Sequence, residues 1–419
     1  MKLRKRILLL GGTSISRQIV YAAHELNYDV YVTDYFEDSP CKKIAEKNFM
    51  VSCTDVDRVV QLIKEEHIDG VIMGYADVLM SSYVQICEKA GLPCYANLHA
   101  IEVTSNKADF KKLCRNFNIP VVPEYSIEDV ENENVVYPLI VKPVDNSGAR
   151  GIYICHDKTE FDKFYPQALQ FSPQKHVLIE RFMNGREATI FYYLHKGEIY
   201  LLGIGDRHML KFSDHFLQLP IGYTFPSVNQ QDFLKVENAN IKRMFKSLNM
   251  NEGMVFMQCF NENGTFIVYE MGYRLTGSLE HHLMEYAYGF NHLKAMLQYA
   301  VGEEVDVKPI QSTNLGNAIL ANVTLLLSEG IIDHYEGMDE VRNMPGVLHI
   351  HESYPVGQAI DESVMGKLAQ VGIRVLLHAD NKKQLLQRMD LVKDTLKVIS
   401  TDNNDMILRN YSYKEICKE

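Results

Sequence analysis

The segment YPLIVKPVDNSGARGIYI, residues 137–154, decides how the rest of the chain is interpreted. Its first half predicts a short apolar strand that ends in Lys142 and a Pro143 turn, and its end predicts a second strand. Between the strands lies a loop of small and basic residues that includes Ser147, Gly148, Arg150 and Gly151. Glycines let backbone N–H groups approach phosphate oxygens, and the cations would neutralise their charge. On this segment alone, a phosphate-binding loop and an ordinary solvated hairpin both stay open.

The composition of the chain limits its class. A length of 419 residues with 46% hydrophobic residues is typical of a globular protein of two or three domains. The net charge of -11 argues against a general nucleic-acid binder. Eight cysteines without a CxxC pair predict reduced thiols and a cytoplasmic location. No apolar run approaches the roughly 20 residues of a membrane span, and the N-terminal RKRILLLGG is too short for a signal peptide.

The first hundred residues alternate between strand and helix patterns, which predicts a parallel sheet. The expected strands are Lys5–Leu10, YDVYVTD ending at Asp34, and DGVIMG near Val71, and the expected helices are Val59–Glu66 and Val78–Ala90. The turn Gly11-Gly12-Thr13-Ser14 lacks the G-x-G-x-x-G spacing of a dinucleotide site. Asp34 is therefore expected to cap the loop that follows it or to line a cleft.

The later segments mix both periodicities. We expect helices over Asp157–Leu169 and Asp232–Leu248, and a hairpin of GMVFMQCF and TFIVYEMGYRL around Glu262-Asn263-Gly264. From about Asn314, glycines punctuate a region that predicts a smaller closing domain.

Two acidic residues flank a turn in VLIERFMNGRE, Glu180 at a strand end and Glu187 seven residues later. An unpaired strand edge can read an adenine edge, and a carboxylate beyond it can accept hydrogen bonds from ribose hydroxyls. An ordinary amphipathic hairpin is the alternative. Lys107 begins a predicted helix, where it would point into a cleft or simply be solvated.

The predicted hairpin brings Gln258 and Glu270 towards one another. Two oxygens on adjacent strands suit Mg²⁺, which takes few protein ligands and keeps several waters. A carboxylate in the apolar strand TFIVYEMGY is costly unless it has a partner. That partner is either a metal or Arg274, which lies four residues later and, by the two-residue period of a strand, on the same face.

In this order, Lys107, KPVDNSGARG, ERFMNGRE and QCF…YEMGYRLTG resemble the ATP-grasp superfamily. The chain looks most similar to its carboxylate–amine ligase branch, which is related to the ATP-grasp domains of carbamoyl phosphate synthetase and biotin carboxylase. The resemblance implies an α/β and α+β architecture. It comprises a Rossmann-like pre-ATP-grasp domain (1–104), an ATP-grasp domain (105–310) and a small C-terminal closing subdomain (311–419).

The resemblance also implies roles around ATP. The phosphates would be held by Lys107, Lys142, Ser147, Gly148, Arg150 and Gly151. The adenine hinge would be Glu180 with the backbone of Arg181, Phe182 and Met183, and the ribose acid would be Glu187. The loop Asp145–Gly151 would be mobile without nucleotide and ordered with it.

The same resemblance implies a metal and a catalytic centre. Glu270 matches a magnesium-binding glutamate, Gln258 occupies the partner position, and Arg274 matches the arginine near the γ-phosphate and the substrate carboxylate. Arg274 and Lys142 are the expected catalytic residues. Where many relatives have E-x-N-x-R, this chain has Gly272 in the third position, so only one protein ligand is anionic and the number of Mg²⁺ ions stays open.

The implied reaction is an ATP-dependent, ADP-forming ligation of a carboxylate to an amine through an acyl phosphate. The expected partners are small-molecule carboxylates and amines, with neither nucleic acid nor membrane, and a homodimer is compatible with the resemblance. Two alternatives stay open: a carboxylase that forms carboxyphosphate, and an ATP-binding module with decayed catalysis. His208 is the best candidate for a general base, and a structural histidine is the alternative.

Overall fold

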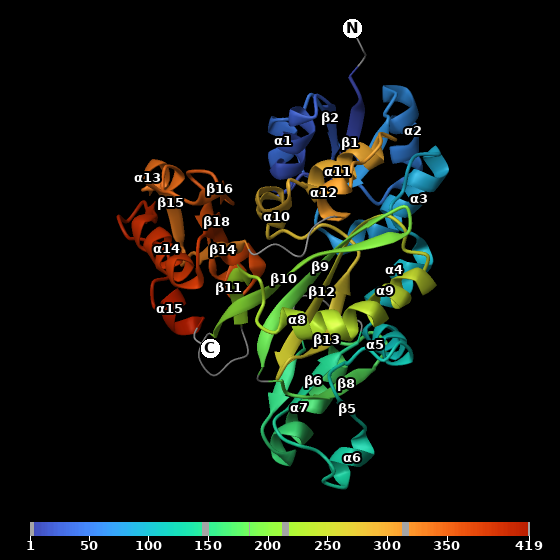
Figure 1. Ribbon diagram of the computed structural model, residues 1–419, viewed down its shortest axis with the longest axis vertical. Helices are drawn as coiled ribbons and strands as arrows, with labels where there is room; N and C mark the ends of the chain where they lie inside the picture. The colour runs from blue at the N-terminus through green and yellow to red at the C-terminus, as the bar shows by residue number, and fades with distance from the viewer. Residues whose placement is uncertain (1–3, 145–150, 184, 212–217, 312–317, 418–419) are drawn as a thin grey trace.

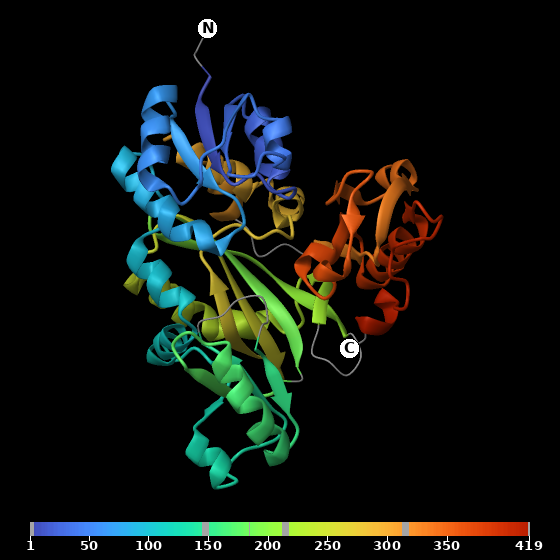
Figure 2. The same cartoon turned by 180° about the vertical axis from the view of Figure 1, so that it is seen from behind.

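The computed structural model describes residues 4–144, 151–183, 185–211, 218–311 and 318–417. An eight-stranded central sheet connects three smaller parts (Figure 1). The N-terminal unit lies at one end of the molecule, a four-stranded sheet lies at the other, and the C-terminal unit lies to one side (Figure 2). None of the helices in the described part of the chain is long and apolar enough to cross a membrane.

The N-terminal unit is a parallel sheet of order β3-β2-β1-β4. Its elements are β1 (Arg6–Leu10), α1 (Arg17–Glu25), β2 (Asp29–Thr33), η1 (Pro40–Lys43), β3 (Lys47–Phe49), α2 (Val56–Glu66), β4 (Gly70–Met73), η2 (Asp77–Leu79), α3 (Met80–Ala90) and α4 (Leu98–Ser105). Asp34 accepts hydrogen bonds from the backbone N–H groups of Gly12 at 2.9 Å and Phe36 at 3.0 Å. The prediction that it caps the following loop is confirmed.

The second unit is an antiparallel sheet of order β5-β8-β6-β7. Its elements are α5 (Lys107–Asn116), β5 (Glu124–Tyr125), α6 (Ile127–Glu131), β6 (Leu139–Pro143), β7 (Tyr153–Cys155), α7 (Lys158–Gln170) and β8 (Val177–Arg181). Helix α7 forms where the sequence predicts one over Asp157–Leu169, and Asp157 is its N-cap. Strands β6 and β7 are the two strands expected around the glycine-rich loop, and residues 145–150 of that loop lie outside the described residues.

The central sheet runs through the middle of the molecule (Figure 1). Its first part comprises β9 (Arg186–His195), β10 (Glu198–Lys211), β11 (Gln218–Phe225), α8 (Gln230–Lys235), α9 (Glu237–Ser247), β12 (Gly253–Glu262), β13 (Thr265–Gly272), α10 (Glu280–Tyr288), α11 (His292–Ala300) and α12 (Lys308–Gln311). The expected helix 232–248 is two helices, because Val236 leaves the helical region at φ -125° and ψ -66°. The expected hairpin forms, and Asn263 and Gly264 take the positive φ angles, 53° and 89°, that an Asn-Gly turn favours.

The C-terminal unit continues this sheet. Its elements are β14 (Ile319–Leu326), β15 (Gly330–Glu336), α13 (Met338–Arg342), β16 (Val347–Glu352), β17 (Ala359–Ile360), η3 (Glu362–Val364), η4 (Leu368–Gln370), β18 (Val371–Ala379), α14 (Lys382–Thr395), β19 (Lys397–Ser400) and α15 (Tyr413–Ile416). The central order is β13-β12-β9-β10-β11-β14-β18-β16, while β17-β15-β19 form a separate small sheet. Pairing of β11 with β14 therefore fixes the C-terminal unit to the rest of the molecule.

Candidate nucleotide and substrate site

Cross-strand pairing places the predicted residues in rows on one face of the central sheet, since directly opposite residues share a face. In the first row, Glu187 of β9 lies opposite Phe260 of β12, which lies opposite Ile267 of β13. Two residues back along β12, Gln258 lies opposite Glu270. The ribose candidate and the metal candidates are therefore neighbours on one surface.

A β-bulge aims Glu270 at this face. The pairs Cys259–Val268 and Gln258–Glu270 are adjacent on β12 but leave Tyr269 as an extra residue on β13. In an unbulged register Tyr269 would lie opposite Gln258, and Glu270 would lie opposite Met257 on the other face of the sheet. Bulges commonly re-aim a side chain in this way next to active sites. The sequence predicts the pairing of the two strands, which is confirmed, but not the bulge.

Glu270 itself corrects one expectation. Its side chain is exposed, so its charge is not buried as the apolar strand suggested, and it makes no hydrogen bond or ion pair with any described residue. The alternative ion pair with Arg274 is not formed. Gly272, which replaces the asparagine of many relatives, is required by packing: a Cβ there would lie 2.3 Å from the ring of Phe256 on the opposing strand.

Arg274 lies beyond the end of β13 and does not share a strand face with Glu270, which corrects the second expectation. Its Nε and Nη2 donate to the two carboxylate oxygens of Asp77 at 2.5 and 2.6 Å. The guanidinium also lies over the ring of Phe256, 5.1 Å from its centre. Asp77, which belongs to the N-terminal unit and lies 197 positions earlier in the chain, thus orients Arg274.

The hinge is held by a buried charge network. Lys142 of β6 donates to Glu180 Oε2 at 2.7 Å, and Lys111 of α5 donates to Glu180 Oε1 at 2.5 Å. The backbone N–H groups of Arg181 and Phe182 donate to the carbonyls of Pro123 and Pro138, which lie just before β5 and β6. That of Met183 donates to no described residue, which leaves it available to a ligand.

An apolar surface adjoins the hinge. Met183 packs with Val122 and with Ile267 of the first row, beside the half-buried ring of Phe260. Next to them Glu187 accepts hydrogen bonds from Arg207 Nη1 at 2.7 Å and from the Tyr269 hydroxyl at 2.9 Å. A planar base could lie on the apolar side chains while its edge meets the Met183 backbone and its sugar meets Glu187.

The remaining nucleotide candidates lie nearby in the fold or outside the described part. Lys107 is the first residue of α5, after the cap Asn106. Gly151 has φ 76°, and a Cβ there would lie 2.6 Å from Phe171, so only glycine fits. Ser147, Gly148 and Arg150, with the loop expected to close over ATP, lie outside the described residues.

His208 is bound within the sheet. Its Nε2 lies 2.8 Å from the Thr224 hydroxyl, and burial lowers its pKa to about 3. That environment favours the structural alternative over a role as general base.

A second polar region lies where the three larger parts meet. Glu280 begins α10, is 1% exposed, and accepts from the Thr276 hydroxyl, while its Oε1 has no partner among the described residues. The Tyr75 hydroxyl, next to β4, is also buried without a partner. Arg374 of β18 lies within electrostatic range of both and makes no ion pair with a described residue. Burial raises the pKa of Glu280 and of Tyr75 and lowers that of Arg374. We call Tyr75, Glu280 and Arg374 the junction.

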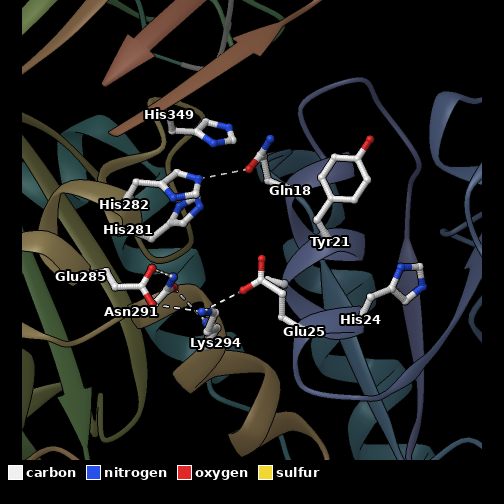
Figure 3. A pocket seen from close by; sticks show the side chains of 11 residues that line it. Gln18, Tyr21, His24, Glu25, His281, His282, Glu285, Asn291, Lys294 and His349 are labelled. Carbon is white, nitrogen blue, oxygen red and sulfur yellow. Dashed lines mark hydrogen bonds and ion pairs between the residues drawn. The ribbon is translucent and has the colours of Figure 1, made fainter. Parts of the chain in front are cut away.

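A cavity of about 480 Å³ is lined in part by His281 and His282, which directly follow Glu280 of the junction in the chain (Figure 3). It is lined by Gln18, Tyr21, Ala22, His24, Glu25, His281, His282, Glu285, Asn291, Lys294 and His349. Its lysine is already paired with Glu25 at 2.8 Å and Glu285 at 3.0 Å, so the cavity does not suit a triphosphate. None of the residues expected to bind ATP lines it.

The side chains that could bind Mg²⁺ at this site are few. Among the described residues, no three histidine, cysteine, aspartate or glutamate side chains are placed to hold a metal. Mg²⁺ needs only one or two protein carboxylates when it also binds phosphates and water. The unpaired, exposed carboxylate of Glu270 opposite Gln258 meets that requirement.

Two family models match successive parts of the chain. Residues 4–105 match the ribonucleotide synthetase preATP-grasp domain, and residues 106–308 match the ATP-binding domain of the carbamoyl-phosphate synthase L chain. The chain belongs to the ATP-grasp superfamily. Its mixed α/β architecture, with a pre-ATP-grasp and an ATP-grasp part, is the one the sequence predicts.

Known proteins agree in fold. The phosphoribosylglycinamide synthetase of Anaerococcus prevotii superposes with a TM-score of 0.76 at 18% identity, over 95% of this chain and 100% of that one. The L-amino acid ligase of Bacillus licheniformis gives 0.75 at 18%, over 96% and 100%. A formate-dependent phosphoribosylglycinamide formyltransferase of Sulfurisphaera tokodaii is 22% identical over 198 residues, 45% of this chain and 50% of that one. The chain thus spans about half the length of the curated relatives it matches.

Sequence reasoning missed several residues of the candidate site. Asp77 and Arg374 lie far from the motifs in sequence and reach the site only through the fold, whereas Lys111, Arg207 and Glu280 follow quoted motifs closely but match none of them. The one available signal was chemical, since Arg374 is a charge within the otherwise apolar segment GIRVLL.

Proposed function

We propose that the chain is an ATP-dependent, ADP-forming ligase that joins a carboxylate to an amine through an acyl phosphate. One observation carries the proposal. A single sheet face presents, in order, the apolar base surface with Glu187, the pair Gln258–Glu270, and Phe256 with the Arg274 guanidinium above it. That is the order of base and sugar, metal and phosphates, and reacting carboxylate.

Each group has a defined task in this proposal. Lys107 and Lys142 hold phosphate oxygens, and the hinge from Glu180 to Met183 orients the base. Arg274 holds the substrate carboxylate in line with the γ-phosphate through its planar fork. Mg²⁺ at Glu270 and Gln258 would neutralise the charge of the transferring phosphoryl group. Attack by the amine on the acyl phosphate then gives the amide and releases phosphate.

The junction is the proposed place for the organic substrates. A buried carboxylate oxygen and hydroxyl without partners cost free energy that a ligand would recover. Arg374 suits an anionic group and Glu280 a donor such as an amine. We therefore place the organic substrates between the N-terminal and C-terminal units. We also propose that residues 1–104, 105–310 and 311–419 act as separate functional units.

The carboxylase alternative remains a second candidate, because biotin carboxylase domains also share the fold: that of Hydrogenobacter thermophilus gives a TM-score of 0.79 at 18% identity over 97% of this chain. ADP release that depends on bicarbonate would favour it, whereas dependence on an organic acid and an amine favours the ligase. We also propose a cytoplasmic location, which the eight free cysteines support.

Calorimetry with ATP and Mg²⁺, followed by an ADP-release screen over acid and amine pairs, tests the proposal. Lys142→Ala should weaken ATP binding by about 1–3 kcal/mol, the scale of a hydrogen bond to a charged group. Lys112→Ala, on the exposed side of α5, is the matched control. ATP affinity unchanged by Lys142→Ala would refute the assignment. Nucleotide binding without ADP release against any pair would favour the decayed module.

A further inference from the structure

Lys111 is the most deeply buried cation near the hinge, with 1% of its surface exposed. It lies one helical turn after Lys107, on the same side of α5. An ammonium so far from water requires partners, because burying an unpaired charge is very costly. Its partners are the Val122 carbonyl at 3.1 Å and Glu180 Oε1 at 2.5 Å, with an ion pair to Glu124 Oε1 at 2.9 Å.

Glu180 is correspondingly fixed. It is 2% exposed, and each of its oxygens contacts a lysine from a different element, Lys111 of α5 and Lys142 of β6. Its strand lies inside the sheet, so its backbone pairs with Glu124 on one side and Ile140 on the other. Neither the backbone nor the carboxylate of Glu180 can move without breaking this network.

Lys142, by contrast, is 12% exposed and lies at the open side of the network. Among the described residues, its ammonium forms an ion pair with Glu180, and this contact fixes its position. Lys111 therefore acts on Lys142 indirectly, because it prevents Glu180 from turning away.

We propose that Lys111 is a positioning residue that holds Glu180, and through it Lys142, in the ATP-binding arrangement before nucleotide arrives. The inference rests on the proposed function, since it assumes that Lys142 and the hinge bind ATP. Lys111 does not touch the nucleotide. Its removal should free Glu180 to pair with Lys142 in other geometries and so reduce ATP affinity without altering the chemical step.

The test compares Lys111→Met with Lys112→Met, whose side chain is exposed one residue later on the same helix. At a temperature where each variant is folded, Lys111→Met should raise the ATP dissociation constant and the KM for ATP about ten- to a hundredfold. The kcat at saturating ATP should stay within about threefold. Lys111→Arg should restore most of the affinity, and Lys112→Met should change neither constant.

A second variant separates positioning of Lys142 from stability alone. Glu124→Gln weakens the same network, but Glu124 does not contact Glu180 through its side chain or Lys142 at all. We therefore expect Glu124→Gln to lower the thermal midpoint and to leave ATP affinity within about twofold. If Lys111→Met does not fold, Lys111→Gln, which keeps a donor and most of the length, carries the test with the same expected direction.

Wild-type ATP affinity in a folded Lys111→Met or Lys111→Gln variant would overturn the inference. So would a loss of affinity in Glu124→Gln as large as theirs, or a failure of Lys111→Arg to restore binding. Absence of ATP binding in the wild type would instead refute the proposed function. The two failures are therefore distinguishable.

Discussion

The hinge and the junction are both buried and charged, but their charges are balanced in different ways. At the hinge, both oxygens of Glu180 contact lysines. At the junction, Glu280 Oε1 and the Tyr75 hydroxyl have no described partner, and Arg374 makes no ion pair with a described residue. The side-chain charges of the hinge are thus balanced without a ligand, whereas the side chains of the junction retain hydrogen-bonding capacity. This is the difference expected if, as we propose, the hinge binds one fixed group, adenine, and the junction binds the organic substrate that sets specificity.

The histidines beside the junction extend this contrast. His282 stacks on His349 with ring centres 4.0 Å apart, and Gln18 contacts both His282 and His351 at 3.2 Å. Burial lowers the pKa of His282, His292 and His351 to about 3 and that of His349 to about 4. The hinge therefore uses paired charges, and this cluster uses neutral imidazoles.

The largest expected effect is acid destabilisation of the histidine cluster. In the folded protein the pKa values of these histidines lie below the value of about 6.5 that is expected in the unfolded chain. Between the folded and unfolded pKa values, the unfolded state therefore binds more protons than the folded state. Stability is fully present above pH 6.5 and falls as the pH drops towards 3. At pH 5, one fully buried histidine such as His292 should lower the free energy of unfolding by about 2 kcal/mol relative to pH 7. Urea unfolding at pH 7 and pH 5 measures the loss.

The control for this prediction separates the cluster from general acid effects. His292→Asn cannot titrate in this range, so the difference in unfolding free energy between pH 7 and pH 5 should shrink by about 2 kcal/mol. His99→Asn, at an exposed position, should leave the difference unchanged. An equal loss in wild type and His292→Asn would show that this histidine is not held neutral by burial.

The second effect concerns the exposed carboxylate between hinge and junction. Glu270→Gln should reduce turnover at least about a hundredfold, the scale of losing one electrostatic contact in the transition state. Its thermal midpoint should match wild type, because Glu270 has no described partner to lose. Glu362→Gln, exposed in η3, serves as the control. A steep fall of the midpoint with residual activity would mean that the carboxylate has a structural role.

Local signals in the sequence were sufficient for much of this arrangement. The Asn263-Gly264 turn fixed the hairpin and so brought Gln258 near Glu270, while the bulge at Tyr269, which the sequence did not predict, set the two directly opposite one another. The apolar strand ending in Lys142 and the carboxylate at Glu180 were also legible. What failed was the strand face of Arg274, because β13 ends at Gly272 and the two-residue period of a strand does not continue to residue 274.

Long-range partners were beyond the reach of such signals. Lys111 looks like any lysine of an amphipathic helix, and its burial depends on Glu180, 69 residues away. Asp77 meets Arg274 only because the N-terminal unit packs against the end of β13. Periodicity describes one element at a time, so charge pairs between elements appear only in the folded structure.

The smallest expected effect lies at Arg274, which links the two regions. Arg274→Lys keeps the charge but loses the planar fork that grips Asp77 and would grip the substrate carboxylate. We expect turnover to fall about tenfold and ATP affinity to change less than threefold, because the fork matters most when the transferring phosphoryl group and the acyl oxygen are both charged. The kcat for ADP release and the ATP dissociation constant are the two measurements. Asp77→Asn should produce a weaker loss in the same direction, since Arg274 then keeps its charge but not its orientation. A collapse of ATP affinity with wild-type kcat would make Arg274 a ground-state phosphate anchor, and would place the reacting carboxylate nearer to Arg374.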